Sequence, residues 1–161
     1  FKSVINHFSE HEFIVAGVSN LSMEWYEEIL KDDKIKIVYD KTYSLLKRST
    51  AAIVTSGTAT LETALFNVPQ IVCYKSSLFS FLVGKLFVKL KFISLVNIIM
   101  EKEVVKELIQ KNCSKRNIVN ELSQLLKKEN NLSVKKEYEV LRGKLGKEKT
   151  SLKVAKLITT G

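Results

Sequence analysis

Residues 56–62, Ser-Gly-Thr-Ala-Thr-Leu-Glu, combine small hydroxylated side chains, a glycine and one carboxylate at the start of a predicted helix. A helix that begins after a glycine-containing turn presents unpaired backbone N–H groups and the positive end of its dipole. Gly57 would let a phosphate approach the backbone, and Ser56, Thr58 and Thr60 would add hydroxyl donors. Glu62 lies about one helical turn further on, where a carboxylate could accept hydrogen bonds from the two hydroxyls of a ribose. The pattern therefore predicts a nucleotide site with phosphates at the helix N-terminus.

The same residues also fit a simple capped helix. Ser56 or Thr58 would then be the N-cap, and Glu62 an acidic residue early in the helix. The segment lacks the Gly-Lys-Ser/Thr ending of a P-loop and the spacing of GxGxxG. From the residues alone, ligand binding and capping both remain open.

Short apolar segments alternate with helical ones through the first half of the chain. The predicted strands are residues 12–17, 34–40, 51–56 and 70–75, and the predicted helices are 23–31, 41–49 and the helix after Gly57. Such alternation is typical of a parallel sheet with helical crossovers, whose ligands bind in loops beyond the carboxyl ends of the strands. Here those loops are residues 17–19, 40–42, 55–58 and 75–77.

After residue 77 the sequence becomes mainly helical. Residues 77–91 are apolar on most sides, 92–100 are predicted to be extended, and 103–111 and 114–129 to be helical with Ser114 as a cap. Two lysine-rich helical segments, divided near Gly143 and Gly146, end the chain. We expect an α/β fold with a Rossmann-like parallel sheet flanked by helices over residues 1–128, and a helical C-terminal extension over 129–161.

Composition indicates a folded domain with an anionic partner. The 161 residues are 45% hydrophobic and 27% charged, with 26 basic and 17 acidic residues and a net charge of +9. Cys73 and Cys113 lie in unrelated contexts, so no disulfide is expected and the cytoplasm is the expected compartment. The chain begins with Phe1 and its first eleven residues read as the end of a helix, so we expect a piece of a larger enzyme.

Three longer strings carry a family resemblance. Residues 42–55, TYSLLKRSTAAIVT, residues 56–75, SGTATLETALFNVPQIVCYK, and residues 92–110, FISLVNIIMEKEVVKELIQ, are similar in order and spacing to the C-terminal half of bacterial lipid-A-disaccharide synthase. The resemblance covers residues 13 to about 128.

That resemblance implies the nucleotide-binding domain of a GT-B glycosyltransferase. The family is an inverting, metal-independent hexosyltransferase that needs no cofactor. It transfers 2,3-diacylglucosamine from UDP to 2,3-diacylglucosamine 1-phosphate and yields lipid A disaccharide 1-phosphate and UDP. The implied location is peripheral, at the inner face of the inner membrane.

The resemblance also assigns roles to individual positions. Ser56, Gly57 and Thr58 would contact the diphosphate, and Glu62 the ribose. Further donor-side positions would be Tyr74, Asn97, Glu103 and Gln110. Without the resemblance, capping or surface polarity would be the simpler explanation of Asn97 and Gln110. Val96 and the pair Glu101-Lys102 depart from the proline and Gly-Arg that the family usually has in this loop, which leaves the path of the loop open.

The catalytic base is unknown and is expected in the absent N-terminal half of the enzyme. Deprotonating a sugar hydroxyl requires a carboxylate or histidine near the anomeric carbon. His7 and His11 lie in the terminal helical segment, where a solvated role is the better expectation. No cluster of His, Cys and Asp suggests a metal site.

The expected partners follow from the same resemblance. They are the UDP-diacylglucosamine donor, a lipid acceptor and the N-terminal domain of the same enzyme, and a homodimer is a further candidate. Lys85, Lys89 and Lys91 interrupt the apolar segment 78–100, so it is predicted to lie on an anionic membrane surface or against another domain rather than to span a membrane.

Two alternatives remain. The chain could belong to another UDP-sugar-using GT-B transferase or epimerase, or it could be a noncatalytic basic module that binds anionic lipid or nucleic acid. Residues 127–161 hold ten Lys or Arg and four Glu. Nucleic acid is the less favoured ligand, because these lysines are not interleaved with aromatic residues in a recognisable motif.

Overall fold

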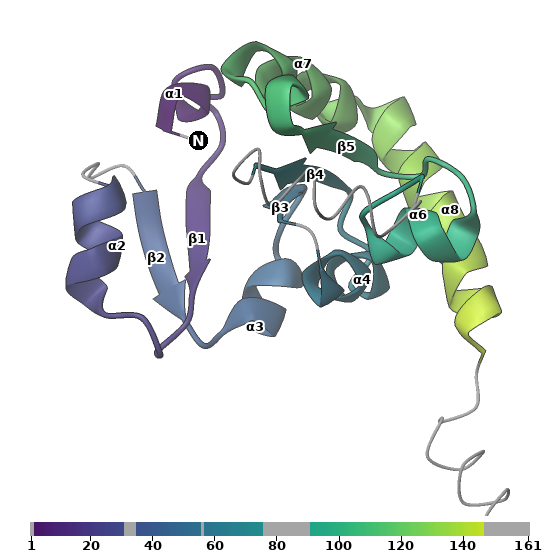
Figure 1. The fold of residues 1–161 in the computed structure, drawn as a ribbon, viewed down its shortest axis with the longest axis horizontal. Coiled ribbons are helices and arrows are strands. Elements are labelled where there is room, and N and C mark those ends of the chain that lie inside the picture. Colours follow the sequence, from purple (N-terminus) through teal and green to yellow (C-terminus); the bar gives the residue numbers. More distant parts are fainter. Residues whose placement is uncertain (1, 31–34, 56, 76–90, 147–161) are drawn as a thin grey trace, which may run out of the picture.

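The computed structural model describes residues 2–30, 35–55, 57–75 and 91–146 (Figure 1). In chain order the first elements are α1 (Lys2–Ile5), β1 (Phe13–Gly17), α2 (Met23–Leu30), β2 (Ile35–Tyr39), α3 (Thr42–Leu46), β3 (Ala52–Val54), α4 (Thr58–Leu65) and β4 (Gln70–Tyr74). They are followed by α6 (Leu95–Met100), β5 (Lys106–Ile109), the 3₁₀ helix η1 (Gln110–Asn112), α7 (Lys115–Leu126) and α8 (Lys128–Leu145).

All five described strands run parallel to their neighbours, in two sheets. β1 pairs with β2, and β3, β4 and β5 form a second sheet with β4 in the centre. The α/β class with parallel strands flanked by helices, typical of a Rossmann-like domain, is confirmed. The strands are divided between two sheets, which the continuous alternation in the sequence did not indicate.

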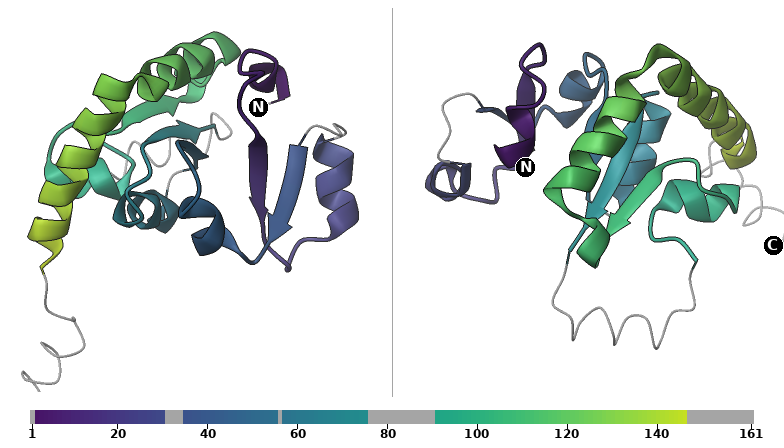
Figure 2. Two further views of the ribbon diagram at one scale, coloured as in Figure 1. Left: turned by 180° about the vertical axis from the view of Figure 1, so that it is seen from behind. Right: turned by 90° about the horizontal axis from the view of Figure 1, so that it is seen from above.

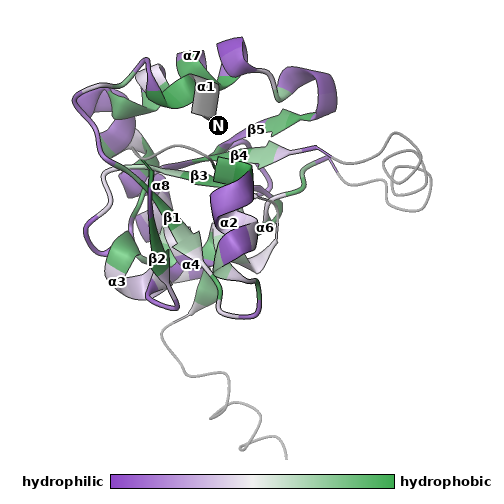
Figure 3. Ribbon diagram, turned by 90° about the vertical axis from the view of Figure 1, so that its left-hand side faces the viewer, coloured by the Kyte–Doolittle hydropathy of each residue, from purple (hydrophilic) through white to green (hydrophobic). Residues whose placement is uncertain are grey.

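Helices cover both faces of the three-stranded sheet (Figures 1 and 2). Successive side chains of a strand point to opposite faces, so Ile71 and Val72 of β4 enter different clusters. Ile71 packs with residues of α1 and α7, whereas Val72 packs with residues of α4, α6 and α8. In Figure 3 these strands are largely apolar and lie between α7 and α4. Burial on both faces explains their continuous Ile/Val composition.

Two segments after residue 91 differ from the sequence prediction. Residues 95–100, expected to be extended, form α6, because Ser94 caps the helix by accepting a hydrogen bond from the Asn97 N–H (3.2 Å). Residues 106–109, expected to be helical, form β5 and pair with Ile71–Tyr74. A short run such as Lys-Glu-Leu-Ile fits either structure locally, and the pairing with β4 decides between them.

The predicted helix after Ser114 is confirmed as α7, whose N-cap Ser114 accepts a hydrogen bond from the Asn117 N–H (3.3 Å). The first of the two predicted lysine-rich segments is α8, which continues through Gly143 and ends before Gly146. The second segment lies outside the described residues. Much of the apolar segment 78–100, with Lys85 and Lys89, lies outside the described residues. Among the described helices, none is both long and apolar enough to cross a membrane.

α8 packs along the amino ends of the three-stranded sheet. Asn131 Nδ2 donates to the carbonyl of Thr50, just before β3 (3.4 Å). Near the start of β4, Gln70 Nε2 donates to the Tyr138 hydroxyl (3.3 Å), and burial raises the pKa of that tyrosine. The lysine-rich helix therefore lies at the edge opposite to the loops that follow the strands. The boundary at 128/129 remains a prediction.

Replacing Leu141 by alanine tests whether α8 belongs to the core. Leu141 has no exposed surface, so Leu141→Ala is expected to lower the free energy of unfolding by about 2–5 kcal/mol in a urea titration. Val140, next to it and 52% exposed, is the control, and Val140→Ala should change stability by less than about 0.5 kcal/mol. Equal effects of the two substitutions would show that α8 does not pack as described.

Candidate functional site

Gly57 forms the turn between β3 and α4 in a conformation that other residues avoid. Its φ is 126° and its ψ is −162°, which is essentially a glycine-only region. A Cβ atom added at Gly57 would meet nothing within 4 Å, so the backbone is open to an approaching group. Thr58 is exposed beside it, and Ser56 lies outside the described residues. The N-cap is Gly57, which has no hydroxyl, and no side-chain capping bond is formed. Thr58 is already the first helical residue, so it is not the N-cap that the capped-helix alternative predicted.

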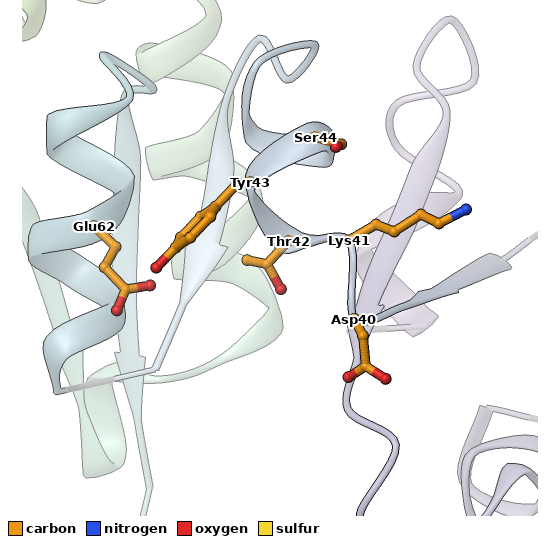
Figure 4. A pocket seen from close by; sticks show the side chains of 6 residues that line it. All are labelled: Asp40, Lys41, Thr42, Tyr43, Ser44 and Glu62. Atoms are coloured by element: carbon orange, nitrogen blue, oxygen red, sulfur yellow. The ribbon is translucent and has the colours of Figure 1, made fainter.

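Glu62 lines a cavity of about 450 Å³. The other lining residues come from the turn after β2 and from α3, namely Asp40, Lys41, Thr42, Tyr43 and Ser44. Figure 4 shows the half-buried Glu62 carboxylate and the hydroxyl end of Tyr43 directed toward the same space. The loop at 40–42 is one of the four strand-end loops expected to bind ligands, but no local pattern joins it to Glu62.

The turn at Asp40 is fixed by bonds to the end of β1. Asp40 adopts a left-handed φ of 52°, its N–H donates to the Gly17 carbonyl (3.1 Å), and its carboxylate accepts from the Ser19 N–H (3.2 Å). Lys41 is the one cation among the six lining residues, against two carboxylates. This balance suits a neutral group rich in hydroxyls and disfavours a free phosphate.

An aromatic surface borders the cavity. The Tyr43 ring stacks on Phe66 of the segment after α4, with centroids 5.1 Å apart and an interplanar angle of 19°. Tyr43 is nevertheless 56% exposed. A ring held from one side and open on the other can stack with a planar ligand group.

Tyr74 and Gln110 are brought to the same sheet edge as Gly57. Tyr74 ends β4 and pairs with Ile109, which immediately precedes Gln110. Gln110 starts η1 with a φ of 50°, and Tyr74 is 37% exposed. Because the carboxyl ends of parallel strands meet at one edge, these residues remain predicted ligand contacts.

Thr60 and Asn97 are placed differently from the prediction, in the interior of the domain. Each is 0% exposed. The Thr60 hydroxyl donates to the Gly57 carbonyl (2.8 Å), so it does not point out of the helix N-terminus. Asn97 Nδ2 donates to the Val105 carbonyl (2.8 Å), and its Oδ1 accepts from the N–H groups of Val104 (2.7 Å) and Val105 (2.9 Å). Asn97 therefore shapes the loop between α6 and β5.

Glu103 is not brought to the edge that carries Gly57. It precedes β5, at the amino end of that strand, and its carboxylate pairs with Lys106 Nζ at 3.3 Å. Its neighbour Lys102 pairs with Glu137 of α8 at 2.7 Å. Glu103 therefore lies beside the helical extension.

Glu107 is a structural residue that sequence reasoning missed. From β5 its carboxylate accepts hydrogen bonds from the N–H groups of Ile93 (3.0 Å) and Ser94 (2.9 Å), and from Asn97 Nδ2 (2.9 Å). One acid thus holds the start of α6 onto the sheet. The local sequence carried little signal, because Glu107 follows Lys106 in a segment that was predicted to be helical.

The two cysteines are in contact, although their sequence contexts suggested no relation. Both pack on the cluster beneath α7. Burial, together with the neighbouring Cys113, raises the pKa of the Cys73 thiol to about 12. Cys73 therefore stays protonated at neutral pH, as expected for a thiol with a packing role.

No metal-binding cluster is found in the described part of the chain. His7 and His11 are exposed in the turns after α1. Among residues 2–30, 35–55, 57–75 and 91–146, no group of three or more His, Cys, Asp or Glu could hold a metal ion.

Comparison with known proteins identifies the family. Residues 2–159 match the lipid-A-disaccharide synthetase family. The chain belongs to this family. The family match includes the Gly57 turn, the Glu62 cavity and the Asn97–Glu107 network.

Individual relatives support the same family assignment. The chain is 35% identical to a lipid-A-disaccharide synthase of Psychromonas ingrahamii over 79% of this chain and 34% of that relative. It is 36% identical to one of Syntrophus aciditrophicus over 84% of this chain and 36% of the relative. A relative from Colwellia psychrerythraea is 42% identical over 57% of this chain and 23% of its own length. The chain thus spans about a third of the length of the first two relatives and less of the third.

Two glycine substitutions, one in the turn and one as a control, test the backbone conformation of Gly57. Gly57→Ala should lower the free energy of unfolding by about 1–3 kcal/mol, because alanine is strained at this φ although the space is open. Gly143 has equally open space but lies inside α8, so Gly143→Ala should stabilise by about 0.5–1 kcal/mol. Thermal unfolding of both variants checks the prediction, and a neutral effect of Gly57→Ala would contradict the assigned conformation.

The Asn97 side chain should be needed for stability. Asn97→Ala leaves the half-buried N–H of Val104 and the buried N–H of Val105 without their acceptor, so we expect a loss of about 2–4 kcal/mol in urea unfolding. Asn120→Ala on the exposed side of α7 is the control and should cost less than about 0.5 kcal/mol. A small effect at Asn97 would mean that the network is not formed.

Proposed function

We propose that this chain is the donor-binding part of a lipid-A-disaccharide synthase, a glycosyltransferase of lipid A biosynthesis. The donor would be UDP-2,3-diacylglucosamine and the acceptor 2,3-diacylglucosamine 1-phosphate. The observation that carries the proposal is the match to the family over residues 2–159. The matched segment contains an open glycine turn at the start of α4 and, further along the same helix, Glu62, which lines a cavity.

The spacing along α4 is consistent with a nucleoside diphosphate. Gly57 and Glu62 are five residues apart, which corresponds to about 7.5 Å along a helix axis. The diphosphate would bind the backbone N–H groups at the Gly57 turn, and the Glu62 carboxylate would accept from the ribose hydroxyls. The exposed Tyr43 ring would offer a stacking surface to the base.

In the proposed reaction the acceptor hydroxyl attacks the anomeric carbon on the side opposite the leaving diphosphate. The bond from that carbon to the phosphate oxygen breaks, the configuration inverts, and UDP leaves with its charge at the helix N-terminus. A general base outside this chain, in the part of the relatives that it does not span, would take the hydroxyl proton.

The setting of the reaction is part of the proposal. Diacylated substrates require access to a membrane, so we propose a cytoplasmic enzyme that binds the inner face of the inner membrane peripherally. Its partners would be the remaining domain of the same enzyme and a second copy in a homodimer. Lys91, whose Nζ lies 5.3 Å from the Phe92 ring centroid, is the described end of the basic, apolar segment suggested for this contact.

Calorimetric titration with UDP tests the nucleotide site. The chain should bind UDP saturably and ADP weakly, and Glu62→Ala should bind UDP about tenfold or more weakly, because it loses charge-assisted hydrogen bonds. Glu139→Gln, an exposed acid on α8, should bind as the parent does.

Absence of UDP binding by a folded chain would contradict the proposal that this chain binds the nucleotide without the remaining domain. Equal affinity for UDP and ADP would contradict recognition of uridine. A steep loss of binding with salt that is shared by UDP and unrelated polyanions would instead support the basic-module alternative.

A further inference from the structure

Thr60 lies where three elements meet beneath the Gly57 turn. Its hydroxyl donates to the Gly57 carbonyl (2.8 Å) and accepts from the Leu95 N–H at the start of α6 (3.3 Å). Its own carbonyl accepts from Gln70 Nε2 of β4 (2.7 Å). The side chain is fully buried, so no solvent competes for these bonds.

The hydrogen bonds continue from Thr60 to the far strand of the sheet. Leu95 follows Ser94, whose N–H donates to the Glu107 carboxylate of β5 (2.9 Å). The same carboxylate accepts from Asn97 Nδ2 (2.9 Å). A continuous path of hydrogen bonds and short backbone links therefore connects Glu107, the first turn of α6, Thr60 and the Gly57 turn.

The orientation of one peptide group explains what this path does. The Gly57 carbonyl accepts from both the Thr60 hydroxyl and the Thr60 N–H (3.2 Å), which turns it toward the helix interior. The peptide bond is planar and trans, so the N–H of Thr58, in the same peptide group, points the opposite way. Thr58 is exposed, and its N–H is therefore directed at the open space before the helix.

We propose that Thr60 is a positioning residue for anion binding at the Gly57 turn, and that Glu107 holds the α6 end of the same network. The inference rests on the proposed function, because it concerns the diphosphate of that nucleotide. Threonine suits the position because its hydroxyl can donate to Gly57 and accept from Leu95 at once. Valine has the same shape and can do neither.

Thr63 provides a matched control. It lies on the same helix, is 3% exposed, and its hydroxyl donates to the Ala59 carbonyl (2.7 Å). Thr60→Val and Thr63→Val thus each remove one buried hydroxyl that donates to a backbone carbonyl three or four residues earlier in the chain. Only the Thr60 hydroxyl has its acceptor in the Gly57 turn and also accepts from the N–H of Leu95 in α6.

Titration of the full chain with UDP, with urea unfolding of each variant, tests the proposal. We expect Thr60→Val to weaken UDP binding about tenfold, Thr63→Val to stay within about twofold, and Thr60→Ser to bind nearly as the parent does. Equal UDP affinity of the two valine variants would overturn the proposal, whatever their stabilities.

Glu107→Gln extends the test if Thr60→Val does not fold. It should weaken UDP binding about threefold, because a neutral amide holds the N–H groups of Ile93 and Ser94, just before α6, less strongly, whereas Glu139→Gln should not. Unchanged UDP affinity of Glu107→Gln would then overturn the proposal.

A measurement without nucleotide separates this inference from the proposed function. The NMR amide shift of Thr58 should move in Thr60→Val and stay in place in Thr63→Val. If the parent chain does not bind UDP, the proposed function fails for this chain, and the Thr58 amide still decides whether Thr60 orients the turn. An unmoved Thr58 amide in Thr60→Val would refute the positioning role.

Discussion

The burial of β4 on both faces is the constraint on which the rest of the structure depends. Ile71 and Val72 are each about fully buried, in clusters on opposite sides of the sheet. A strand in this position can satisfy its backbone only by pairing with neighbours on both edges, and β3 and β5 supply those pairs. Their parallel register brings the ends of three strands, and with them the Gly57 turn, Tyr74 and Gln110, to one edge. The candidate site is therefore a consequence of how the core is covered.

The first half of the fold could be predicted from the sequence because its signals are local. Ile/Val runs bounded by turns mark β1 to β4, and Gly57 before a helical pattern marks the start of α4. α6 and β5 were assigned wrongly, since their structures depend on distant partners. Residues 106–109 become a strand through pairing with residues 71–74, and α6 is held by Glu107 from that strand. Neither dependence is visible in a window of ten residues.

The candidate site was predictable in part, for a similar reason. Gly57 and Glu62 belong to one short segment, whereas the Asp40–Ser44 wall of the cavity lies about twenty residues earlier in the sequence and joins Glu62 only in the fold. Residue type also did not reveal on which side of a helix Thr60 lies. Its spacing to Thr63 and Ala64, both buried, is that of a core-facing stripe and could have indicated burial. Asn97 gave no such signal, because the four hydrogen bonds of its side chain go to a loop and a strand that follow it.

The position of α8 bears on how the site could attract an anion. The net charge of +9 suggests lysines as phosphate ligands, yet the lysine-rich α8 packs against Thr50 and Gln70, at the amino ends of the strands. At the opposite edge the donors offered by the Gly57 turn are backbone N–H groups. A lysine can swing toward a phosphate from several directions, whereas a backbone N–H points where its peptide group is held. Binding that relies on such groups depends on how firmly the turn is fixed, and this gives the buried contacts of Thr60 a role beyond stability.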